Sequence, residues 1–335
     1  MLTLGIETSC DETSAAVIKD GAEVLSNIVL SQAIHGRFGG VVPELASRAH
    51  IKTVVPIYRQ ALEEAGVTID RVGLVAATMG PGLVGPLLVG LTFAKGLAFA
   101  NSIPFVAVNH IEGHLAANYL EHPDMEKRHL SLIVSGGHTL LVEVDGFGSY
   151  DVIGQTKDDA VGEAFDKVAK IMGMGYPGGE KLDKLAQSGN ARFHRFPRAM
   201  MKEEGYQFSY SGLKTAVALH IGKLSEGDFE RQKADLAASF QEAAVEVLVE
   251  KTIRAAGERN IRDIALAGGV AANSRLRSMF AERIDKNRHR LFWPPVELCT
   301  DNAAMIAAAG YYRYRQDGPS ELITNAVPYL RLSEM

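Results

Sequence analysis

Two histidines in the motif NHIEGH have the spacing of a metal-binding pair. His110 and His114 are four residues apart, so on an α-helix their imidazole rings lie on one face, within reach of a single ion. The motif directly follows an apolar stretch that predicts a buried strand. Two core histidines satisfied by hydrogen bonds would show the same spacing, so a metal site requires a third ligand.

The third ligand that the sequence offers is Asp301, in the motif CTDNAAM. This acid stands at the expected start of the last helix, where its carboxylate could instead serve as the N-cap, and the residues alone favour the cap. The motif around the histidines is not the HExxH signature of metallopeptidases. Glu112 stands two residues from each histidine and so points about 200° round the helix from them, which argues against a role as general base.

Two further acids, Asp11 and Glu12, lie in a polar turn between two predicted strands. In this position they could align a nucleophile, lie near a metal, or simply interact with solvent. The residues alone leave these alternatives open.

Glycine-rich turns follow two apolar strands, VSGGH at 134–138 and AGGVAAN at 267–273. Their backbone N–H groups can approach a phosphate closely, although paired glycines are also ordinary turn residues. The two turns stand at equivalent places in two halves of the chain, and YPGG at 176–179 adds a third, which predicts a nucleotide cleft between two lobes.

Asp166 and Asp183 fall inside predicted helices, where a solvated helix face is the favoured interpretation.

The elements that must position these residues form two similar series. Residues 3–30 predict three strands, and residues 130–155 predict a second three-strand meander. Each half then closes with a strand, a glycine turn and a helix, in VGLVAATMGPG and IRDIALAGGVAANSRL. Further helices are predicted at 43–66, 158–172, 179–188, 211–222 and 228–257, with a last helix at about 301–325.

Composition favours a two-lobed cytoplasmic protein. A length of 335 residues with 47% apolar residues predicts more than one lobe. The net charge of −5 argues against a protein that binds nucleic acid through its own positive field, so partners are expected to help. Cys10 and Cys299 form no CxxC pair and are expected to be reduced thiols, and the first residues lack the features of a signal peptide.

The stretch between Arg71 and Lys95 contains no charged residue and on hydropathy alone could suggest a membrane span. Glycines and prolines at 80–82 and 85–86 interrupt it. We therefore expect a buried strand at 72–78, a buried helix at 86–100 and a strand at 103–108, which form a βαβ unit in the core and no membrane segment.

Ten motifs together resemble the bacterial branch of the TsaD family, tRNA N6-adenosine threonylcarbamoyltransferases formerly described as Gcp or O-sialoglycoprotein endopeptidases. They span nearly the whole chain in this order: GIETSCDET, GGVVPELASRAH, GPGLVGPLLVG, NHIEGH, VSGGHT, DDAVGEAFDK, YPGG, FSYSGLKT, AGGVAANSRLR and CTDNAAM. The resemblance implies an α/β fold like that of actin, sugar kinases and heat-shock ATPases, with duplicated ribonuclease H-like cores and a nucleotide cleft between them. It implies an N-terminal lobe at 1–128, a C-terminal lobe at 129–300 and a last helix that packs back on the first lobe.

The same resemblance implies the site residues. His110, His114 and Asp301 match the metal ligands of the family, with Fe(2+) the expected metal and Zn(2+) or Mg(2+) as alternatives. Asp183 is the position at which some family members differ. The implied substrate-binding residues are Ile133, Val134, Ser135, Gly136, Gly137, Asp166, Gly179, Asp183 and Asn273.

The implied reaction transfers a threonylcarbamoyl group from threonylcarbamoyl adenylate to the N6 amine of adenosine 37 in tRNAs that read ANN codons. The cleft would bind this adenylate, or ATP or AMP. Asp11 is expected to orient the amine or accept its proton, with Glu12 as the substitute. The expected partners are tRNA, a TsaB-like paralogue and a TsaE-like ATPase.

Three other functions remain open at this point. The same fold serves ATPases and small-molecule kinases, because fold does not fix function. A zinc peptidase is less consistent with the position of Glu112. A scaffold that binds nucleotide only to hold a partner is disfavoured by the intact ligand set and glycine turns.

Overall fold

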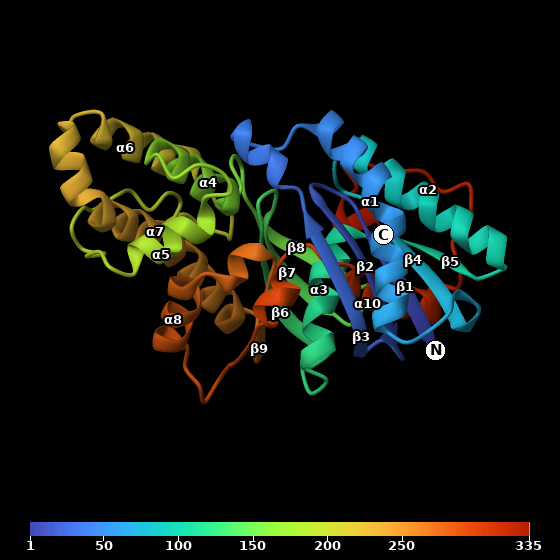
Figure 1. Cartoon of the computed structure of the whole chain (residues 1–335). Coiled ribbons are helices and arrows are strands. Elements are labelled where there is room, and N and C mark those ends of the chain that lie inside the picture. Colours follow the sequence, from blue (N-terminus) through green and yellow to red (C-terminus); the bar gives the residue numbers. More distant parts are fainter. Residues whose placement is uncertain (335) are drawn as a thin grey trace. The chain divides into compact units, whose positions relative to one another are not determined.

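The computed structural model describes residues 1–334, which form two compact units. Unit 1 consists of residues 1–127, 145–150 and the chain from 294 onward. Unit 2 consists of residues 128–144 and 151–293. Each unit contains one five-stranded sheet with helices packed against it (Figure 1).

The sheet of unit 1 has the strand order β3-β2-β1-β4-β5. The first three strands form an antiparallel meander, and β4 and β5 extend it in parallel from β1. The carboxyl ends of the parallel strands therefore meet at one edge, where ligand sites of α/β proteins occur. The strands are β1 (Leu2–Glu7), β2 (Glu12–Lys19), β3 (Glu23–Ser31), β4 (Val72–Gly80) and β5 (Phe105–Asn109).

Helices cover both faces of this sheet (Figure 1). Along β2, Ala15 and Val17 belong to the core with α1 and α2, whereas Ala16 and Ile18 belong to the core with α3 and α10. This alternation follows from the two-residue period of a strand and explains why nearly every residue of β2 is buried. The helices are α1 (Pro43–Glu64), α2 (Val84–Asn101), α3 (His110–Glu121), α9 (Val296–Cys299) and α10 (Ala303–Asp317).

The contact between α10 and the sheet depends on small residues. A Cβ atom on Gly5 would lie 2.2 Å from the carbonyl oxygen of Ala303, and one on Gly310 would lie 2.3 Å from Cβ of Ala76. The alanine-rich sequence of α10 therefore allows its backbone to lie directly on β1 and β4. This contact places the residues just before α10 beside the strand ends.

Unit 2 repeats the same strand order as β8-β7-β6-β9-β10, and β9 is parallel to both β6 and β10. The match between the two sheets confirms the duplicated α/β fold that the two sequence series predict. The strands are β6 (Arg128–Val134), β7 (Thr139–Asp145), β8 (Tyr150–Gln155), β9 (Asp263–Ala267) and β10 (Arg290–Phe292). The helices are α4 (Val161–Ile171), α5 (Gly179–Ala186), α6 (Ser211–Ile221), α7 (Glu226–Glu258) and α8 (Ser274–Arg283).

The helices lie close to their predicted ranges, with two differences at their ends. The helix predicted from residue 158 begins at Val161, because the backbone of Ala160 is extended, with ψ at 153°, and the carboxylate of Asp158 accepts a hydrogen bond from the Tyr210 N–H at 2.7 Å. The last helix, predicted to reach about residue 325, ends at Asp317, because Gly318 has a φ of 80° and Pro319 follows it. Short 3-10 helices complete the chain at Ala33–Arg37, Ile69–Arg71, Gly269–Ala272 and Leu332–Glu334.

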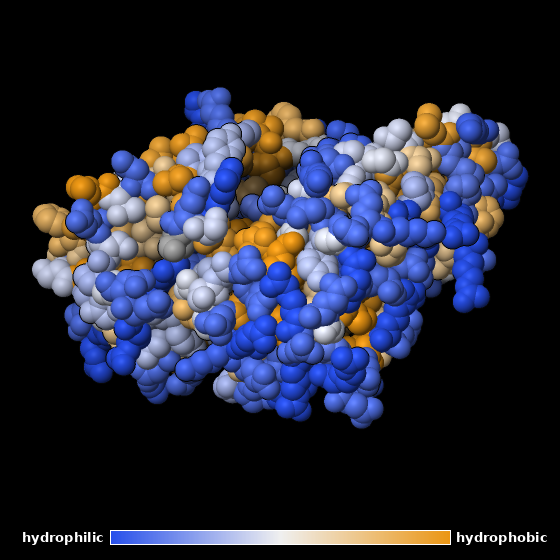
Figure 2. Space-filling view, turned by 180° about the vertical axis from the view of Figure 1, so that it is seen from behind, coloured by the Kyte–Doolittle hydropathy of each residue, from blue (hydrophilic) through white to orange (hydrophobic). Residues whose placement is uncertain are grey.

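Within residues 1–334, α2 is the one helix with the length and apolar composition to cross a membrane. One face of α2, with Leu87, Leu91, Ala94 and Ala98, is buried where the helix packs on β4 and α1. Only 33% of the helix is buried, so the predicted buried helix has an exposed apolar face as well. On the face drawn in Figure 2, hydrophilic residues cover much of the surface and hydrophobic residues lie between them in smaller groups.

Candidate metal centre and substrate loops

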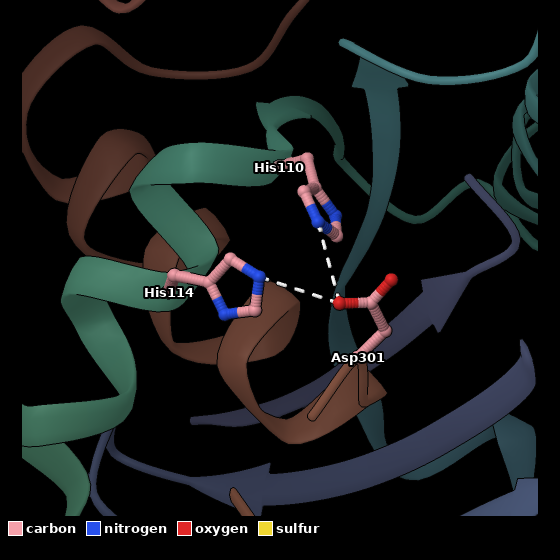
Figure 3. Close-up of side chains that lie close together, drawn as sticks. All are labelled: His110, His114 and Asp301. Carbon is pink, nitrogen blue, oxygen red and sulfur yellow. Dashed lines mark ion pairs between the residues drawn. The ribbon is translucent and has the colours of Figure 1, made fainter. Parts of the chain in front are cut away.

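His110, His114 and Asp301 converge in unit 1 (Figure 3). The Nε2 atoms of His110 and His114 lie 3.4 and 3.3 Å from Oδ1 of Asp301. The two histidines come from the first turns of α3, which begins directly after β5. Because one ligand atom of each residue lies within 4.8 Å of the others, one cation could contact all three.

The carboxylate of Asp301 is not the N-cap of α10. Asn302 takes that position, and its Oδ1 accepts a hydrogen bond from the Met305 N–H at 3.0 Å. The interpretation of Asp301 as a cap is therefore wrong. The neighbouring amide satisfies the helix terminus, so the carboxylate is available to face the histidines.

The three residues fit a divalent cation. His114 is fully buried, and within residues 1–334 its Nε2, which faces Oδ1 of Asp301 at 3.3 Å, forms no hydrogen bond with that oxygen or with any other atom. A buried polar atom without a partner is costly, and coordination of a cation would satisfy it. Two imidazole nitrogens and one carboxylate oxygen form a donor set that suits Fe(2+) or Zn(2+), and three protein ligands leave coordination positions open.

The charges of the triad stabilise one another. Burial alone would raise the pKa of Asp301, but the adjacent His110 outweighs burial, and the pKa lies well below its ordinary value. Burial alone would lower the pKa of His110, but the carboxylates of Asp301 and Glu7 hold it well above its ordinary value. The two carboxylates that face His110 therefore favour a positive charge at this site, either a proton on His110 or a metal ion in its place.

Glu7 lies behind His110 and is the site residue that sequence reasoning missed. Its Oε2 lies 3.1 Å from Nδ1 of His110 and accepts a hydrogen bond from the Thr78 hydroxyl at 2.6 Å, while Oε1 accepts one from the Ser9 N–H. The Glu7 side chain is fully buried. A carboxylate on one ring nitrogen fixes the tautomer that presents the other nitrogen to a metal. The sequence signal that could have identified Glu7 was its position as an acid at the end of an apolar strand.

Glu112 faces a different partner from the histidines beside it. Its Oε2 accepts a hydrogen bond from Nε of Arg313 at 3.1 Å, and its Oε1 contacts Nη2 of the same guanidinium. Arg313 also contacts Asp317 at 3.2 Å. The ion pair joins α3, which carries both histidines, to α10, which follows Asp301. Glu112 is thus committed to a structural contact and is unavailable as a general base, as its helical position predicts.

Asp11 and Glu12 lie at the turn between β1 and β2. The Asp11 carbonyl accepts a hydrogen bond from the Gln32 N–H at 3.1 Å, and Oε1 of Glu12 accepts one from the Ser31 hydroxyl at 3.0 Å. Burial, followed by the charges of Asp301 and Asp11, raises the pKa of Glu12 to about 9. Within residues 1–334 no hydrogen bond joins either acid to the triad, so their catalytic role stays a prediction.

The predicted substrate segment at residues 133–137 lies in unit 2, where it consists of the last two residues of β6 and the turn that leads to β7. Ile133 and Val134 are buried, whereas the loop after them is closed by a hydrogen bond from the Ser135 N–H to the His138 carbonyl at 2.8 Å. A Cβ atom on Gly136 or Gly137 would meet nothing within 4 Å. The backbone of these two glycines therefore faces open space, as access for a ligand requires.

Asp166 and Asp183 do not form solvated helix faces, so that interpretation of both is wrong. Oδ1 of Asp166 accepts hydrogen bonds from the N–H groups of Gly178 and Gly179 at 2.8 and 3.1 Å. The carboxylate of Asp183 accepts from the N–H and hydroxyl of Ser274 at 3.1 and 2.7 Å. Each acid therefore holds a neighbouring turn in place.

Asn273 performs a similar task at the start of α8. Its Oδ1 accepts a hydrogen bond from the Leu276 N–H at 2.9 Å, and its Nδ2 donates to Oε1 of Gln241 at 3.1 Å. Asn273 precedes Ser274, the partner of Asp183. The structure thus joins the predicted residues in pairs, Asp166 with Gly179 and Asp183 with the residue after Asn273. A direct ligand contact for them remains a prediction.

Comparison of the sequence with known proteins gives a consistent relationship. Residues 23–308 match the family described as TsaD, tRNA N6-adenosine threonylcarbamoyltransferase. A Caldicellulosiruptor saccharolyticus protein of that name is 53% identical over 333 residues, which cover 99% of this chain and 98% of the relative. A Clostridium perfringens protein of that name is 51% identical over 334 residues, with the same coverage.

Comparison of the fold gives more distant neighbours. The (R)-2-hydroxyglutaryl-CoA dehydratase component A of Acidaminococcus fermentans has a TM-score of 0.57 at 14% identity, over 94% of this chain and 100% of that chain. Full-length HypF, in its phosphate- and nucleotide-bound form, has a TM-score of 0.64 at 13% identity, over 95% of this chain and 47% of that chain. At this level of identity the likenesses show the fold alone.

Proposed function

This chain belongs to the TsaD family of tRNA N6-adenosine threonylcarbamoyltransferases, and from that premise we propose that it transfers the threonylcarbamoyl group of threonylcarbamoyl adenylate to adenosine 37 of tRNAs that read ANN codons. The product is N6-threonylcarbamoyladenosine. The observation that carries the proposal is 53% identity over 99% of the chain with a relative of that name. The convergent His110, His114 and Asp301 side chains are what that activity would need from unit 1.

Donor binding is assigned to unit 2 in this proposal. Open backbone at Gly136 and Gly137 gives N–H groups that a phosphate can approach, and the carboxylate of Asp166 fixes the turn at Gly179. The other proposed donor-binding residues are Ile133, Val134, Ser135, Asp183 and Asn273. The proposed domains are residues 1–128 and 129–300, with the last helix assigned to the first.

The proposed metal ligands are His110, His114 and Asp301, with Fe(2+) as the metal and Zn(2+) or Mg(2+) as alternatives. When bound there, the cation would supply Lewis-acid stabilisation of negative charge on donor oxygens. Glu7 fixes the orientation of His110 through Nδ1, and the Glu112–Arg313 pair holds the helix that carries both histidines. The positions of the two proposed histidine ligands thus depend on Glu7, Glu112 and Arg313, which are not themselves proposed metal ligands.

The acceptor amine is a poor nucleophile, so catalysis requires that it be held against the carbamoyl carbon. We assign Asp11 to orient this amine or accept its proton, with Glu12 as the substitute. The raised pKa of Glu12 makes Asp11 the better candidate, because a protonated carboxyl group cannot accept a proton. An Asp11→Asn variant that transfers at the wild-type rate would remove this assignment.

The proposed function is tested by nucleoside mass analysis of unmodified tRNA. The tRNA is incubated with the chain, its TsaB-like and TsaE-like partners, a divalent metal and synthetic threonylcarbamoyl adenylate. We expect N6-threonylcarbamoyladenosine with the intact chain and none with His110→Ala, provided that circular dichroism shows a folded variant. Absence of product from the intact chain, together with rapid ATP turnover stimulated by a small acceptor, would instead indicate an ATPase or kinase.

We propose that the chain acts in the cytoplasm with two partners, a TsaB-like paralogue and a TsaE-like ATPase. A surface that could bind a partner is formed by exposed apolar side chains on two helices that pack together, Ile51 and Val55 on α1 and Val84, Leu88 and Phe99 on α2. The three on α2 fall within about 60° of one another round the helix and so form one face. Exposed apolar faces of this kind mark protein interaction sites.

Copurification with the paralogue tests this surface. Leu88→Asp is expected to abolish copurification, because a charge would be buried at the interface. Leu219→Asp is the matched control, since Leu219 is also exposed but lies on α6 of unit 2. Equal copurification of both variants would exclude the α2 face.

A further inference from the structure

Unit 2 contains a basic groove that is separate from the predicted substrate residues. The groove is a cavity of about 890 Å³ lined mainly by residues between Ala191 and Glu203, together with Glu242, Glu246 and Arg283. None of these residues belongs to the metal centre or to the substrate loops. The groove therefore requires its own explanation.

The sequence at the groove has a local excess of positive charge. From Ala191 to Lys202 the chain has lysine or arginine at 192, 195, 198 and 202 and no aspartate or glutamate, and Glu203 and Glu204 follow directly. The whole chain, in contrast, has a net charge of −5. A cationic segment in an acidic protein concentrates attraction for a polyanion at one place.

Two of the three carboxylates that line the groove, Glu242 and Glu246, are already paired. Nε of Arg198 lies 2.7 Å from Oε2 of Glu246, and Nη2 of Arg283 lies 3.2 Å from Oε1 of the same carboxylate. Glu242 accepts two hydrogen bonds from Arg275, at 2.6 and 3.1 Å. These two acids therefore do not neutralise the remaining cations of the groove.

Three cations remain available for a ligand. Arg192, Arg195 and Lys202 are exposed, and within residues 1–334 none of them forms an ion pair with a carboxylate. Glu203, the other acid that lines the groove, can offset one of these charges at most. Two or more positive charges are thus left facing solvent in a concave surface, where an anion would be bound more strongly than on a convex one.

The backbone that carries these cations is fixed, although it forms no regular helix or strand. The Asn190 N–H donates to the carboxylate of Asp235 on α7 at 2.7 Å, and the His194 N–H donates to the Ser239 hydroxyl on the same helix at 3.0 Å. Phe196 is buried and anchors the segment in the core. Arg192 and Arg195, which lie between these anchors, are therefore presented from a defined position.

Phe193 lies between the first two cations in the sequence, does not itself line the groove, and is 43% exposed beside it. An exposed aromatic ring flanked by arginines is a combination that single-stranded RNA uses, because the cations contact phosphates and the ring stacks on an unpaired base. An acidic protein partner would need the positive charges but not the exposed ring. The combination therefore favours RNA.

We propose that the basic groove binds the phosphate backbone of the acceptor tRNA through Arg192, Arg195 and Lys202, with Phe193 stacking on an unpaired base. The inference rests on the proposed function, which makes tRNA the acceptor. The chain as a whole is negatively charged, and the groove gives it a local positive surface for the tRNA. Substitution of the cations should weaken binding of all tRNAs similarly, because phosphates carry no sequence information.

The test compares two triple variants in the complex with the partner proteins. R192Q/R195Q/K202Q removes the groove cations, whereas K223Q/K286Q/R288Q removes three exposed cations elsewhere in unit 2. The Kd for tRNA is measured by filter binding at several salt concentrations, and KM and kcat are measured in the nucleoside assay. Circular dichroism and copurification of the partner proteins verify folding and assembly.

We expect the groove variant to raise the Kd and KM for tRNA by on the order of 10-fold or more and to reduce the salt slope by about one for each lost phosphate contact. The loss should appear in KM rather than in kcat, and KM for the donor should not change. The control variant should match wild type. Phe193→Ala should raise the Kd several-fold while the salt slope stays the same, since stacking releases no counterions.

Unchanged Kd and salt slope in the groove variant would overturn the proposal. Loss of the partner proteins from the groove variant, with no loss of tRNA binding, would likewise overturn it and identify an acidic protein as the ligand. Failure of the proposed function gives a different result, because wild type would then make no modified nucleoside while filter binding would still report on the groove.

Discussion

The candidate metal centre of unit 1 and the candidate substrate loops of unit 2 use charged side chains in opposite ways. In unit 1 the charged groups face one another inside the core, with Glu7 against His110 and both histidines against Asp301. In unit 2 the carboxylates of Asp166 and Asp183 accept hydrogen bonds from neighbouring turns. The groups that remain open to a ligand there belong to the backbone of Gly136 and Gly137. Side chains form the first site, whereas in the second site they hold the backbone in place.

This difference predicts different responses to substitution. Loss of a side chain in unit 1 removes a ligand or leaves a buried charge without its partner, so metal binding or folding should fail. Loss of an acid in unit 2 should loosen a turn and affect donor binding, while metal binding continues. Metal affinity and KM for the donor therefore separate the two regions.

The largest effect on stability is expected for Arg313→Met. The variant leaves the fully buried Glu112 without its ion-pair partner, which costs about 3–5 kcal/mol. Arg275→Met in unit 2 is the control, because the Arg275–Glu242 pair is partly exposed and should cost about 1 kcal/mol or less. Urea unfolding measures both. Equal losses of unfolding free energy in the two variants would show that burial does not increase the contribution of the Glu112–Arg313 pair to stability.

Asp301→Asn should have the largest effect on metal binding. The variant keeps the size of the side chain but removes the negative charge that faces both histidines. We expect the affinity for Fe(2+) or Zn(2+), measured by competition with a chelator, to fall by more than about 100-fold. Asp183→Asn in unit 2 should leave this affinity at the wild-type value. A metal affinity that survives Asp301→Asn would place the cation elsewhere.

Glu7→Gln should weaken metal binding by about 10–100-fold, the range typical of residues that orient a ligand without touching the metal. The reason is loss of the charged acceptor for Nδ1 of His110, which leaves the ring less firmly oriented. Glu23→Gln, on exposed β3, is the control for removal of an acid from the same unit. If Glu7→Gln binds metal like wild type, the contact behind His110 has only a structural role.

Asp166→Ala tests the contrasting behaviour of unit 2. It removes the acceptor of two backbone N–H groups at the start of α5, with an expected cost of about 1.5–3 kcal/mol. We expect KM for the donor to rise while metal affinity stays unchanged. A parallel loss of metal would mean that the two regions are coupled through the fold.

The sequence predicts the strands and helices of both units better than it predicts the side-chain contacts at the candidate sites. Periodic apolar patterns give the strand meanders and most helices, because those elements depend on neighbouring residues. The resemblance supplies the convergence of His110, His114 and Asp301, which spacing alone leaves open. The partners of Glu7 and Glu112 could not be predicted, because Thr78 lies 71 residues from the first and Arg313 lies 201 residues from the second.

Local signals also failed where two neighbouring residues competed for one role. Asp301 and Asn302 are both good N-caps, and only the backbone geometry shows that Asn302 takes the position. Asp166 and Asp183 resemble ordinary surface acids in a helix until the turns that they hold are folded beside them. Tertiary contacts decide such cases, and a single sequence does not contain them.

The smallest effect on stability is expected at the glycines of unit 2, where the backbone is the proposed contact. In Gly136→Ala and Gly137→Ala the added methyl group meets nothing within 4 Å, so the free energy of unfolding should change by less than about 0.5 kcal/mol. KM for the donor should nevertheless rise several-fold, because the methyl group occupies the space through which a phosphate would approach. Gly268→Ala is the informative control, since its φ is 86° and its Cβ would lie 2.4 Å from the Val134 carbonyl oxygen, so that variant should lose stability. If Gly136→Ala and Gly137→Ala keep the wild-type KM, the open backbone is an ordinary turn and the donor binds elsewhere.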